Sequence, residues 1–527
     1  MDQLGLIATI NAIRSPGRLA VKMLGSGEGR TWAQLEDRST RLANALIGSG
    51  LKSGDRIAAW LEDSLEYVET YFAAAKAGLV MVPVNERFRA AEAGYQIERT
   101  EASALLFSSG VVPALTQLLG EHEIPIVIGV SGAARDVRGA LDFEALLAKG
   151  SANPLPLPDE NAPFSICFTS GTTGFPKGAT LTHRSLHNVA RTQTAGLRLV
   201  LGSINLQLAS MSFPATFGSH ILSHAYVGGT TVLVGRWGGD AEALMSVVES
   251  EGINHFYLPT PLLAPFTELC AADRTRWRML QSVLHAGSRA DPDLLRDLAD
   301  VIGRRFVEGW GMSEISGGIC TAISVRDLVG GSEASDLFAS VGRPVPDAAI
   351  RLVDENRAPV PHDGETVGEL VVKASSLMRG YWGDQAATDK AIVDGWYHSG
   401  DLGRIDPAGY VYIVDRRPDL IISGGMNVYP AELELVINKI DGVQESAVVA
   451  GAHSRWGQTP VACIVRRPGS ALTEEQVIAV FAEQMASYKK PTRVIFLDEL
   501  PRHPTSAKLL RTVLRDMVAE SAREVVQ

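Results

Sequence analysis

The sequence is short of the features that mark several classes of protein. Only four cysteines occur among its 527 residues: Cys167, Cys270, Cys320 and Cys463. No two of them have the spacing of a metal site or a redox motif. We therefore expect reduced thiols and a cytoplasmic location. The chain also has no internal repeat and no low-complexity tract.

A long apolar run and an excess of basic residues are missing as well. The most apolar stretch, residues 71–84, is interrupted by Lys76 and is too short to span a bilayer. Residues 1–18 carry an early acid and no long apolar core, which predicts no signal peptide. The net charge is −11, whereas a protein that binds nucleic acid usually carries a basic face. We therefore expect no transmembrane segment and no nucleic-acid partner.

What the chain does contain is a regular alternation of helix and strand patterns. Residues 31–50 have apolar side chains at helical spacing, and the strand pattern of residues 55–61 follows them. Such alternation predicts an α/β fold with parallel sheets covered by helices. Short strands between Pro, Gly and Asp turns then predict a small antiparallel barrel over residues 341–416. Residues 419–527 predict a separate small α+β domain.

One segment combines an unusual number of hydroxyls and glycines. Residues 165–183 read SICFTSGTTGFPKGATLTH, so the polar turn directly follows apolar strand residues. Backbone N–H groups and short side-chain donors in such a turn suit polyphosphate oxygens, and a lysine adds positive charge. The spacing is not that of a Walker loop. On spacing alone, a phosphate-binding loop and an ordinary glycine–threonine turn both remain open.

The same segment resembles the phosphate loop of the adenylate-forming superfamily, which includes acyl-CoA synthetases, peptide-synthetase adenylation domains and luciferases. Further motifs follow in the family's order over nearly the whole chain. They are WGMSE (310–314), VGRPVP (341–346), GELVVKASSLMRGYWGD (368–384), DGWYHSGDLGRID (394–406), VDRRPDLIISGGMNVYPAELE (414–434) and LPRHPTSAKLLR (500–511). The resemblance implies a large N-terminal domain over 1–416, a hinge at 417–418 and a mobile C-terminal lid domain over 419–527.

The resemblance also implies a two-step reaction and a set of nucleotide contacts. ATP and a carboxylate first give an acyl-adenylate and pyrophosphate, and a second nucleophile then takes the acyl group. Trp310 would lie against the adenine, Asp401 would accept the ribose hydroxyls, and Glu314 would hold Mg²⁺, which prefers oxygen ligands. The implied ATP-binding residues are Thr169, Ser170, Gly171, Thr172, Thr173, Gly174, Lys177, Trp310, Gly311, Ser313, Asp401 and Arg416.

Lys508, together with Thr169 and Glu314, is the expected catalytic set. The lysine motif departs from the family pattern Pro-Arg-x-x-x-Gly-Lys, because it has one extra residue and Ala507 in place of the glycine. The other basic candidates, Lys489 and Lys490, are expected to be structural or near the acceptor channel.

The hinge departs from the family pattern too. Pro418 stands where relatives usually have Asp or Lys, at the point about which the C-terminal domain is thought to rotate. Proline fixes φ and leaves only ψ to move, and the preceding Arg417 is restricted as well. The hinge of this chain therefore differs from that of its relatives in the freedom of its backbone.

The acyl pocket is expected around Ala286, Gly287 and Ser288, with residues 210–224 as another wall. Ala215 stands where many relatives have a histidine, which predicts a wider or more apolar pocket there. We interpret His220 and His224, four residues apart, as packing or pocket residues because no other metal-ligand pattern accompanies them.

The first functional hypothesis is an acyl-CoA ligase that uses ATP, Mg²⁺ and CoA. Gly424 and Gly425 would let pantetheine approach the adenylate closely. The alternative is a stand-alone amide ligase that hands the acid to an amine, which Pro418 and the shifted lysine favour. A third reading, a non-catalytic binding module, is disfavoured by the intact phosphate loop. The acid itself, fatty, aryl or alicyclic, stays open, as does the oligomeric state, with a homodimer as one alternative.

Overall fold

The computed structural model describes residues 2–169, 176–235, 237–287, 290, 292–330, 336–416, 421–428, 430–501, 509 and 511–524. The chain forms two compact units. The larger comprises residues 1–86, 93–167 and 178–414, and the smaller comprises residues 87–92, 168–177 and 415–527. The predicted hinge at 417–418 lies outside the described residues.

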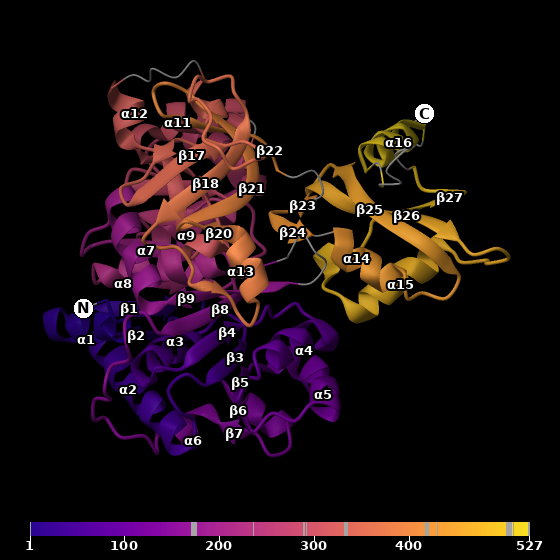
Figure 1. Cartoon of the computed structure of the whole chain (residues 1–527). Helices are drawn as coiled ribbons and strands as arrows, with labels where there is room; N and C mark the ends of the chain where they lie inside the picture. The colour runs from indigo at the N-terminus through magenta and orange to yellow at the C-terminus, as the bar shows by residue number, and fades with distance from the viewer. Residues whose placement is uncertain are drawn as a thin grey trace. The chain divides into compact units, whose positions relative to one another are not determined.

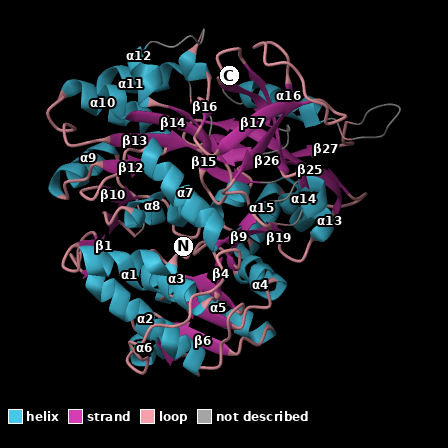
Figure 2. Ribbon diagram, turned by 60° about the vertical axis from the view of Figure 1, so that its left-hand side comes forward, coloured by secondary structure: helices cyan, strands magenta, loops and turns pink. Residues whose placement is uncertain are grey.

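The first sheet of the larger unit has eight strands within the described residues. Their spatial order is β19 (Gly380–Tyr381), β9 (Lys177–Thr182), β8 (Pro163–Thr169), β4 (Val80–Pro83), β3 (Arg56–Trp60), β5 (Ala104–Phe107), β6 (Ile126–Gly129) and β7 (Leu141–Asp142). From β8 to β7 neighbouring strands are parallel. Helices α2 (Trp32–Gly48) and α3 (Leu65–Ala77) lie on one side of β3 and β5, and α5 (Val112–Glu121) lies on the other (Figure 1). Figure 2 shows α2 and α3 beside each other in a second view. Both faces are covered, which explains why these strands are mostly apolar.

The second sheet has nine strands within the described residues. Their order is β16 (Arg343–Pro344), β15 (Ile319–Ile323), β14 (Phe306–Gly311), β13 (Ser282–Ala286), β12 (His255–Tyr257), β10 (Ile204–Gln207), β11 (Thr230–Leu233), β1 (Leu19–Met23) and β2 (Gly29–Thr31). The six strands from β14 to β1 pair in parallel, and antiparallel strands stand at both ends. The predicted parallel α/β architecture is thereby confirmed.

The predicted barrel-like part is confirmed as an antiparallel sheet. Its strands are β17 (Ala348–Val353), β18 (Gly368–Ala374), β21 (Trp396–Ile405) and β20 (Ile392–Val393), and β22 (Val411–Arg416) pairs with β21. The other helices of this part of the chain are α1 (Gly5–Arg14), α4 (Ala90–Arg99), α6 (Phe143–Leu147), α7 (His183–Gly196), α8 (Leu222–Tyr226), α9 (Ala241–Ser250), α10 (Leu263–Ala272), α11 (Pro292–Ile302), α12 (Val325–Gly330) and α13 (Gln385–Ala391).

The smaller unit has an α+β fold, as predicted. Its strands are β24 (Met426–Val428), β23 (Ile421–Ser423), β26 (Gly457–Arg466), β25 (Val443–His453) and β27 (Arg493–Leu497). Its helices are α14 (Pro430–Ile437), α15 (Glu474–Gln484) and α16 (Arg511–Glu524). Val448 and Ile464 pack with residues of α14 and α15, whereas Val449 and Cys463 pack with residues of α16. The strands therefore bury both faces, because successive side chains point to opposite sides.

Helix α3 shows how local sequence sets an element and its packing. Ser64 caps its start by accepting a hydrogen bond from the Tyr67 amide, and Gly78 ends it in the left-handed conformation, with φ of +69°. The helix is buried along nearly its whole length, and its buried residues include the charged Glu69 and Lys76. Buried charges require partners.

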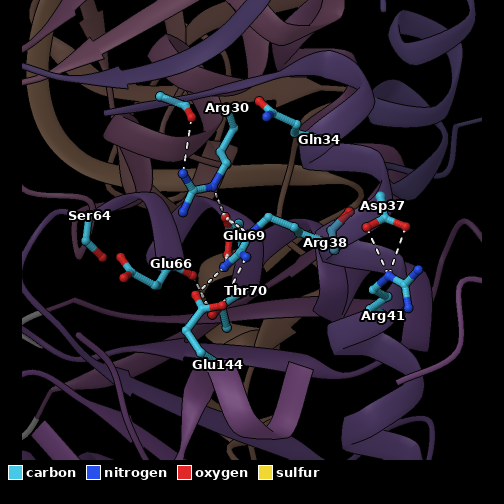
Figure 3. A network of polar contacts seen from close by, with 12 residues as sticks. Arg30, Gln34, Asp37, Arg38, Arg41, Ser64, Glu66, Glu69, Thr70 and Glu144 are labelled. Atoms are coloured by element: carbon cyan, nitrogen blue, oxygen red, sulfur yellow. Dashed lines mark hydrogen bonds and ion pairs between the residues drawn. The ribbon is translucent and has the colours of Figure 1, made fainter. Parts of the chain in front are cut away.

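The buried carboxylate of Glu69 pairs with two arginines, Arg30 and Arg38 (Figure 3). Its Oε1 accepts hydrogen bonds from Arg30 Nε at 2.7 Å and from Arg38 Nε at 2.6 Å. Arg38 also donates to the exposed carboxylate of Glu144, with Nη1 at 3.0 Å from Oε2. The Glu69 side chain is fully buried. The Glu69 carboxylate therefore joins β2 and α2 to α3, and Arg38 links α6 to the network through Glu144.

Two expectations from composition bear on the structure. The four cysteines are buried and form no disulfide. Burial raises the pKa of Cys167 to about 12 and that of Cys463 to about 11, so these thiols stay protonated. Over the described residues, no helix combines the length and the apolar character needed to cross a membrane.

We expect the buried histidines to make the fold acid-sensitive. Burial lowers the pKa of His183 and His224 to about 4 and that of His220 and His255 to about 3. In the unfolded chain these histidines have the ordinary pKa of about 6.5. Below that pH the unfolded chain therefore binds protons that the native state does not bind. The free energy of unfolding should therefore decrease as the pH falls from 6.5 towards 4, by about 1.4 kcal/mol per pH unit for each histidine.

Urea unfolding at pH 7, 6 and 5 measures this loss. His255→Asn should reduce the pH slope by the contribution of about one proton, and His362→Gln, which replaces an exposed histidine, is the control variant. A His255→Asn slope equal to that of the wild type would contradict the assignment.

Candidate active site

Glu314 lies on a short 3-10 helix, residues Ser313–Ile315, that follows the end of β14. Its side chain is largely buried and accepts a hydrogen bond from the Tyr381 hydroxyl, with 3.1 Å between Oη and Oε1. Its carbonyl oxygen accepts from the Met378 amide at 2.7 Å. Tyr381 belongs to β19, which pairs with β9, the strand that begins at Lys177. Two sheets therefore fix the position of this carboxylate.

Two buried tyrosines, Tyr381 and Tyr397, interact with the Glu314 carboxylate. Burial, followed by the Glu314 carboxylate, raises the pKa of both Tyr381 and Tyr397 well above the ordinary value. Both hydroxyls therefore stay protonated, and that of Tyr381 donates to the acid. Sequence reasoning assigned no role to either tyrosine, although Tyr381 lies within the GELVVKASSLMRGYWGD motif and Tyr397 within DGWYHSGDLGRID.

Trp310 and Asp401, both predicted to contact the nucleotide, meet directly. The indole Nε1 of Trp310 donates to Asp401 Oδ2 at 2.9 Å. Trp310 lies on β14 and Asp401 on β21, so this bond joins the nine-stranded sheet to the barrel-like sheet. The Trp310 ring also packs with Ile315 and Cys320. Its predicted stacking on adenine stays a prediction.

We expect Asp401→Ala to weaken ATP binding by roughly 10- to 150-fold, since a hydrogen bond to a charged group contributes about 1.5–3 kcal/mol. Trp310→Phe keeps an aromatic ring but removes the N–H that orients Asp401, so its effect should have the same sign and be smaller. Calorimetric titration with ATP measures both. Asp394→Ala removes an exposed acid of the same motif and serves as the control. An ATP affinity unchanged by Asp401→Ala would refute the ribose assignment.

The residues after Glu314 pack tightly against the predicted acyl wall. Gly317 has φ of +71°, and a Cβ placed there would lie 2.4 Å from the backbone nitrogen of Ala215. Ser219 Oγ donates to the carbonyl of Gly317 at 2.6 Å. Ala215 directly precedes the π-helical segment Thr216–Ile221. The predicted metal-binding motif and one wall of the predicted acyl pocket are therefore in contact, with glycine required at the point of contact.

Tyr257 joins the two segments predicted to line the acyl pocket. Its hydroxyl donates to the carbonyl of Ala286 at 3.1 Å, and its ring centroid lies 5.8 Å from that of His220. Ala286 ends β13, and Gly287 continues with φ of +80°. Sequence reasoning missed Tyr257, which ends a short strand without a recognisable motif.

The predicted histidine pair packs in the interior. His220 and His224 are both buried, and His224 Nδ1 lies 2.7 Å from the carbonyl oxygen of His220. The ring of His224 also contacts that of His255 in an edge-to-face arrangement. Within the described residues no group of three or more His, Cys, Asp or Glu side chains could hold a metal. These contacts agree with their interpretation as packing residues.

Several other predicted residues lie at the ends of strands or in turns. Thr169 ends β8 and Lys177 begins β9, with Thr169 Oγ1 donating to the Lys177 carbonyl at 3.4 Å. Gly424 and Gly425 have φ of +57° and +80° and form the two-residue turn between β23 and β24, a turn that requires positive φ. Eight predicted residues lie outside the described residues: Ser170, Gly171, Thr172, Thr173, Gly174, Ser288, Pro418 and Lys508. The side chain of Arg416 is not described either.

One of the candidate lysines, Lys489, lies within the described residues. Lys489 is buried, and its Nζ lies 2.8 Å from Glu432 Oε1 of α14. This ion pair agrees with its interpretation as a structural residue. The predicted catalytic residue, Lys508, lies outside the described residues.

The residues around Glu314 fit a magnesium ion held together with a nucleotide. A dedicated protein cage for Mg²⁺ would need several oxygen ligands, and the described residues contain no cluster of three acidic or histidine ligands. Mg²⁺ is more often bound through one or two carboxylates and the substrate phosphates. A single oriented carboxylate, such as that of Glu314, suits this second arrangement.

Known proteins resemble the chain over most of its length. The AMP-binding enzyme family matches residues 9–382, and the AMP-binding enzyme C-terminal domain matches residues 432–507. Feruloyl-CoA synthase of Amycolatopsis sp is 33% identical, over 95% of this chain and 96% of its own. Medium-chain-fatty-acid–CoA ligase of Ectopseudomonas oleovorans is 30% identical, over 94% and 92%.

Solved structures share the fold. Amide bond synthetase McbA from Marinactinospora thermotolerans superposes with a TM-score of 0.85 over 97% of this chain and 99% of its own, at 24% identity. At that identity the likeness concerns the fold alone. The family match covers the strands and turns that carry Glu314, Trp310 and Tyr381, and the curated relatives extend over both compact units. This chain therefore belongs to the AMP-binding enzyme family, the adenylate-forming ligases that include the acyl-CoA synthetases.

Proposed function

We propose that the protein is an acid–CoA ligase. A carboxylate oxygen of the acid attacks the α-phosphorus of ATP and pyrophosphate leaves, which gives the acyl-adenylate. The thiolate of CoA then attacks the acyl carbon, and AMP leaves as the thioester forms. The observation that carries the proposal is the Trp310–Asp401 hydrogen bond, which brings two predicted nucleotide contacts into one buried site.

The chain's own residues would mainly bind, orient and neutralise charge. Asp401, oriented by Trp310, would accept the ribose hydroxyls, and Thr169 and Lys177 would contact the phosphates. Glu314, oriented by Tyr381, would hold Mg²⁺, which when bound neutralises phosphate charge. Lys508 would neutralise the charge that develops on the α-phosphate in the transition state. These groups lower the barrier because they are in place before the charge appears.

The choice of CoA as acceptor rests on the relatives. Both curated relatives compared above are named as CoA synthases or ligases, and each aligns over more than nine tenths of this chain. The amide-ligase alternative rests on Pro418, because a hinge with fixed φ favours a single domain arrangement. Small amines need no long channel for a thiol, so such an enzyme could complete both steps without a large rotation.

One experiment decides between the two acceptors. The full-length protein is incubated with ATP, Mg²⁺ and a panel of fatty, aryl and alicyclic acids, followed by CoA or a mixture of amino acids. Mass spectrometry then identifies the product. Thioester without amide supports the proposal, and amide without thioester establishes the alternative. Failure to form pyrophosphate and acyl-adenylate with any acid would overturn both.

A further inference from the structure

A buried carboxyl group lies behind the start of the predicted acyl wall. Asp63 stands in the loop between β3 and α3 and is 8% exposed. Its Oδ1 accepts a hydrogen bond from the amide of Met211 at 2.8 Å. Its Oδ2 is buried, and no described group forms a hydrogen bond with it. Met211 itself is fully buried, one residue into the wall segment 210–224.

Two further side chains hold the same turn. Tyr71 of α3 donates its hydroxyl to the carbonyl of Met211 at 3.2 Å. Ser210 donates to Glu86 Oε2 at 3.0 Å, and Glu86 follows the end of β4. The Ser210 hydroxyl in turn accepts from the amide of Ser212 at 3.3 Å. Residues at the ends of β3 and β4 and on α3 therefore bind both the amide and the carbonyl of Met211 and the side chain before it.

Tyr71 also contacts the segment that forms the predicted acyl wall, residues 210–224. The Tyr71 ring stacks on that of Phe217, with 3.7 Å between centroids and 7° between planes. Phe217 lies in the π-helical segment Thr216–Ile221, directly after Ala215. Such segments are frequent at functional sites. A shift of the Met211 turn would move the backbone that carries Ala215 and Phe217.

We propose that Asp63 is a positioning residue, which fixes the turn at Met211 and thereby sets the shape of the acyl pocket. The proposal rests on the proposed function, since it assumes that residues 210–224 line the pocket of an adenylate-forming ligase. The role assigned to Asp63 is indirect: it holds the wall and contacts neither ATP nor the acid.

The surroundings of Asp63 favour its uncharged form. The pKa of Asp63 is raised to about 8: burial is the main cause, the Met211 amide lowers the pKa, and the neighbouring acids Glu86 and Glu62 raise it. The other titratable groups that face it, Tyr67 and Tyr71 of α3, have raised pKa values and stay neutral. At neutral pH the carboxyl therefore carries its proton and holds Met211 without adding charge. Ionisation above pH 8 would strengthen the bond from the Met211 amide but would place an anion beside two acids.

Two substitutions separate positioning from general stability. Asp63→Ala removes the acceptor for the Met211 amide, so we expect the KM for the preferred acid to rise at least tenfold while the KM for ATP changes less than twofold. Asp63→Asn keeps a carbonyl acceptor and cannot ionise. It should rescue the acid KM at pH 7.

Thermal unfolding gives a readout independent of activity. The native state of the wild type holds a proton on Asp63 that the unfolded state releases above pH 4. The Tm of Asp63→Asn should therefore exceed that of the wild type by a margin that grows from pH 5 to pH 8. Tyr71→Phe, which removes the bond to the Met211 carbonyl, should raise the acid KM in the same direction and keeps the test valid if Asp63→Ala fails to fold. Asp37→Asn, at a half-exposed site on α2, is the matched control.

The KM values for the acid and for ATP are measured from pyrophosphate release with a graded panel of acids. Acid KM values that stay at the wild-type level in both Asp63→Ala and Tyr71→Phe would overturn the proposal. So would equal increases in the KM for ATP and for the acid that Asp63→Asn does not rescue. A wild type that forms no adenylate with any acid would overturn the proposed function and this proposal together, so the two failures can be told apart.

Discussion

Replacement of Lys508 by alanine is expected to slow acyl-adenylate formation by about 100-fold or more. The ammonium group would no longer neutralise the charge that develops on the α-phosphate when pyrophosphate leaves. Transfer from preformed acyl-adenylate to the acceptor should survive, because that step needs no charge at the former leaving group. Single-turnover assays of the two half-reactions measure both effects.

Lys439→Ala is the control for this variant, because it removes an exposed lysine of the smaller unit. Its adenylation rate should equal that of the wild type. Pyrophosphate release that is equally fast in Lys508→Ala would show that the extra residue in the PRHPTSAK motif has moved the catalytic role to another lysine.

Replacement of Glu69 by alanine is expected to lower the free energy of unfolding by about 3–5 kcal/mol. The substitution leaves Arg30 and Arg38 without the buried carboxylate that both contact (Figure 3). Neither arginine can lose its proton, so both charges would remain in a partly buried site. Urea unfolding, monitored by far-ultraviolet circular dichroism, measures this decrease in the free energy of unfolding.

Glu144→Ala provides a matched comparison in the same network. Glu144 contacts Arg38 too, but its side chain is 57% exposed. An exposed ion pair contributes only about 0–1 kcal/mol, so this variant should unfold close to the wild type. Equal losses in the two variants would show that burial does not decide the contribution of these pairs.

The fold could be predicted from the sequence where its cause is local. Residues 65–77 carry a capping serine before them and a glycine after them, and α3 has those bounds. The order of strands within a sheet could not be predicted in the same way. Strand β1 pairs with β11, whose residues lie some two hundred positions further along the chain. Nothing in either short apolar run specifies the other, because the pairing is selected by the packing of the whole sheet.

In the candidate site, too, local sequence identifies single residues but not the contacts between distant ones. The motifs identify Glu314, Trp310 and Asp401 by resemblance, but not the contacts that hold them. Trp310 and Asp401 are 91 residues apart, Glu314 and Tyr381 are 67 apart, and Asp63 and Met211 are 148 apart. Each contact joins side chains on different elements, so only the assembled fold brings them together. The raised pKa of Asp63 follows from the same cause, since burial cannot be read from the short segment around it.

The close approach of Gly317 to Ala215 has a consequence for attempts to redesign the choice of acid. A larger residue at 317 would meet backbone atoms, which no change of rotamer can move aside. A loop grafted from a relative in place of residues 214–221 must therefore keep the same backbone path at 215, or be transferred together with residues 316–318. Libraries that randomise the two segments as a single block should yield more folded members than libraries that randomise either one alone.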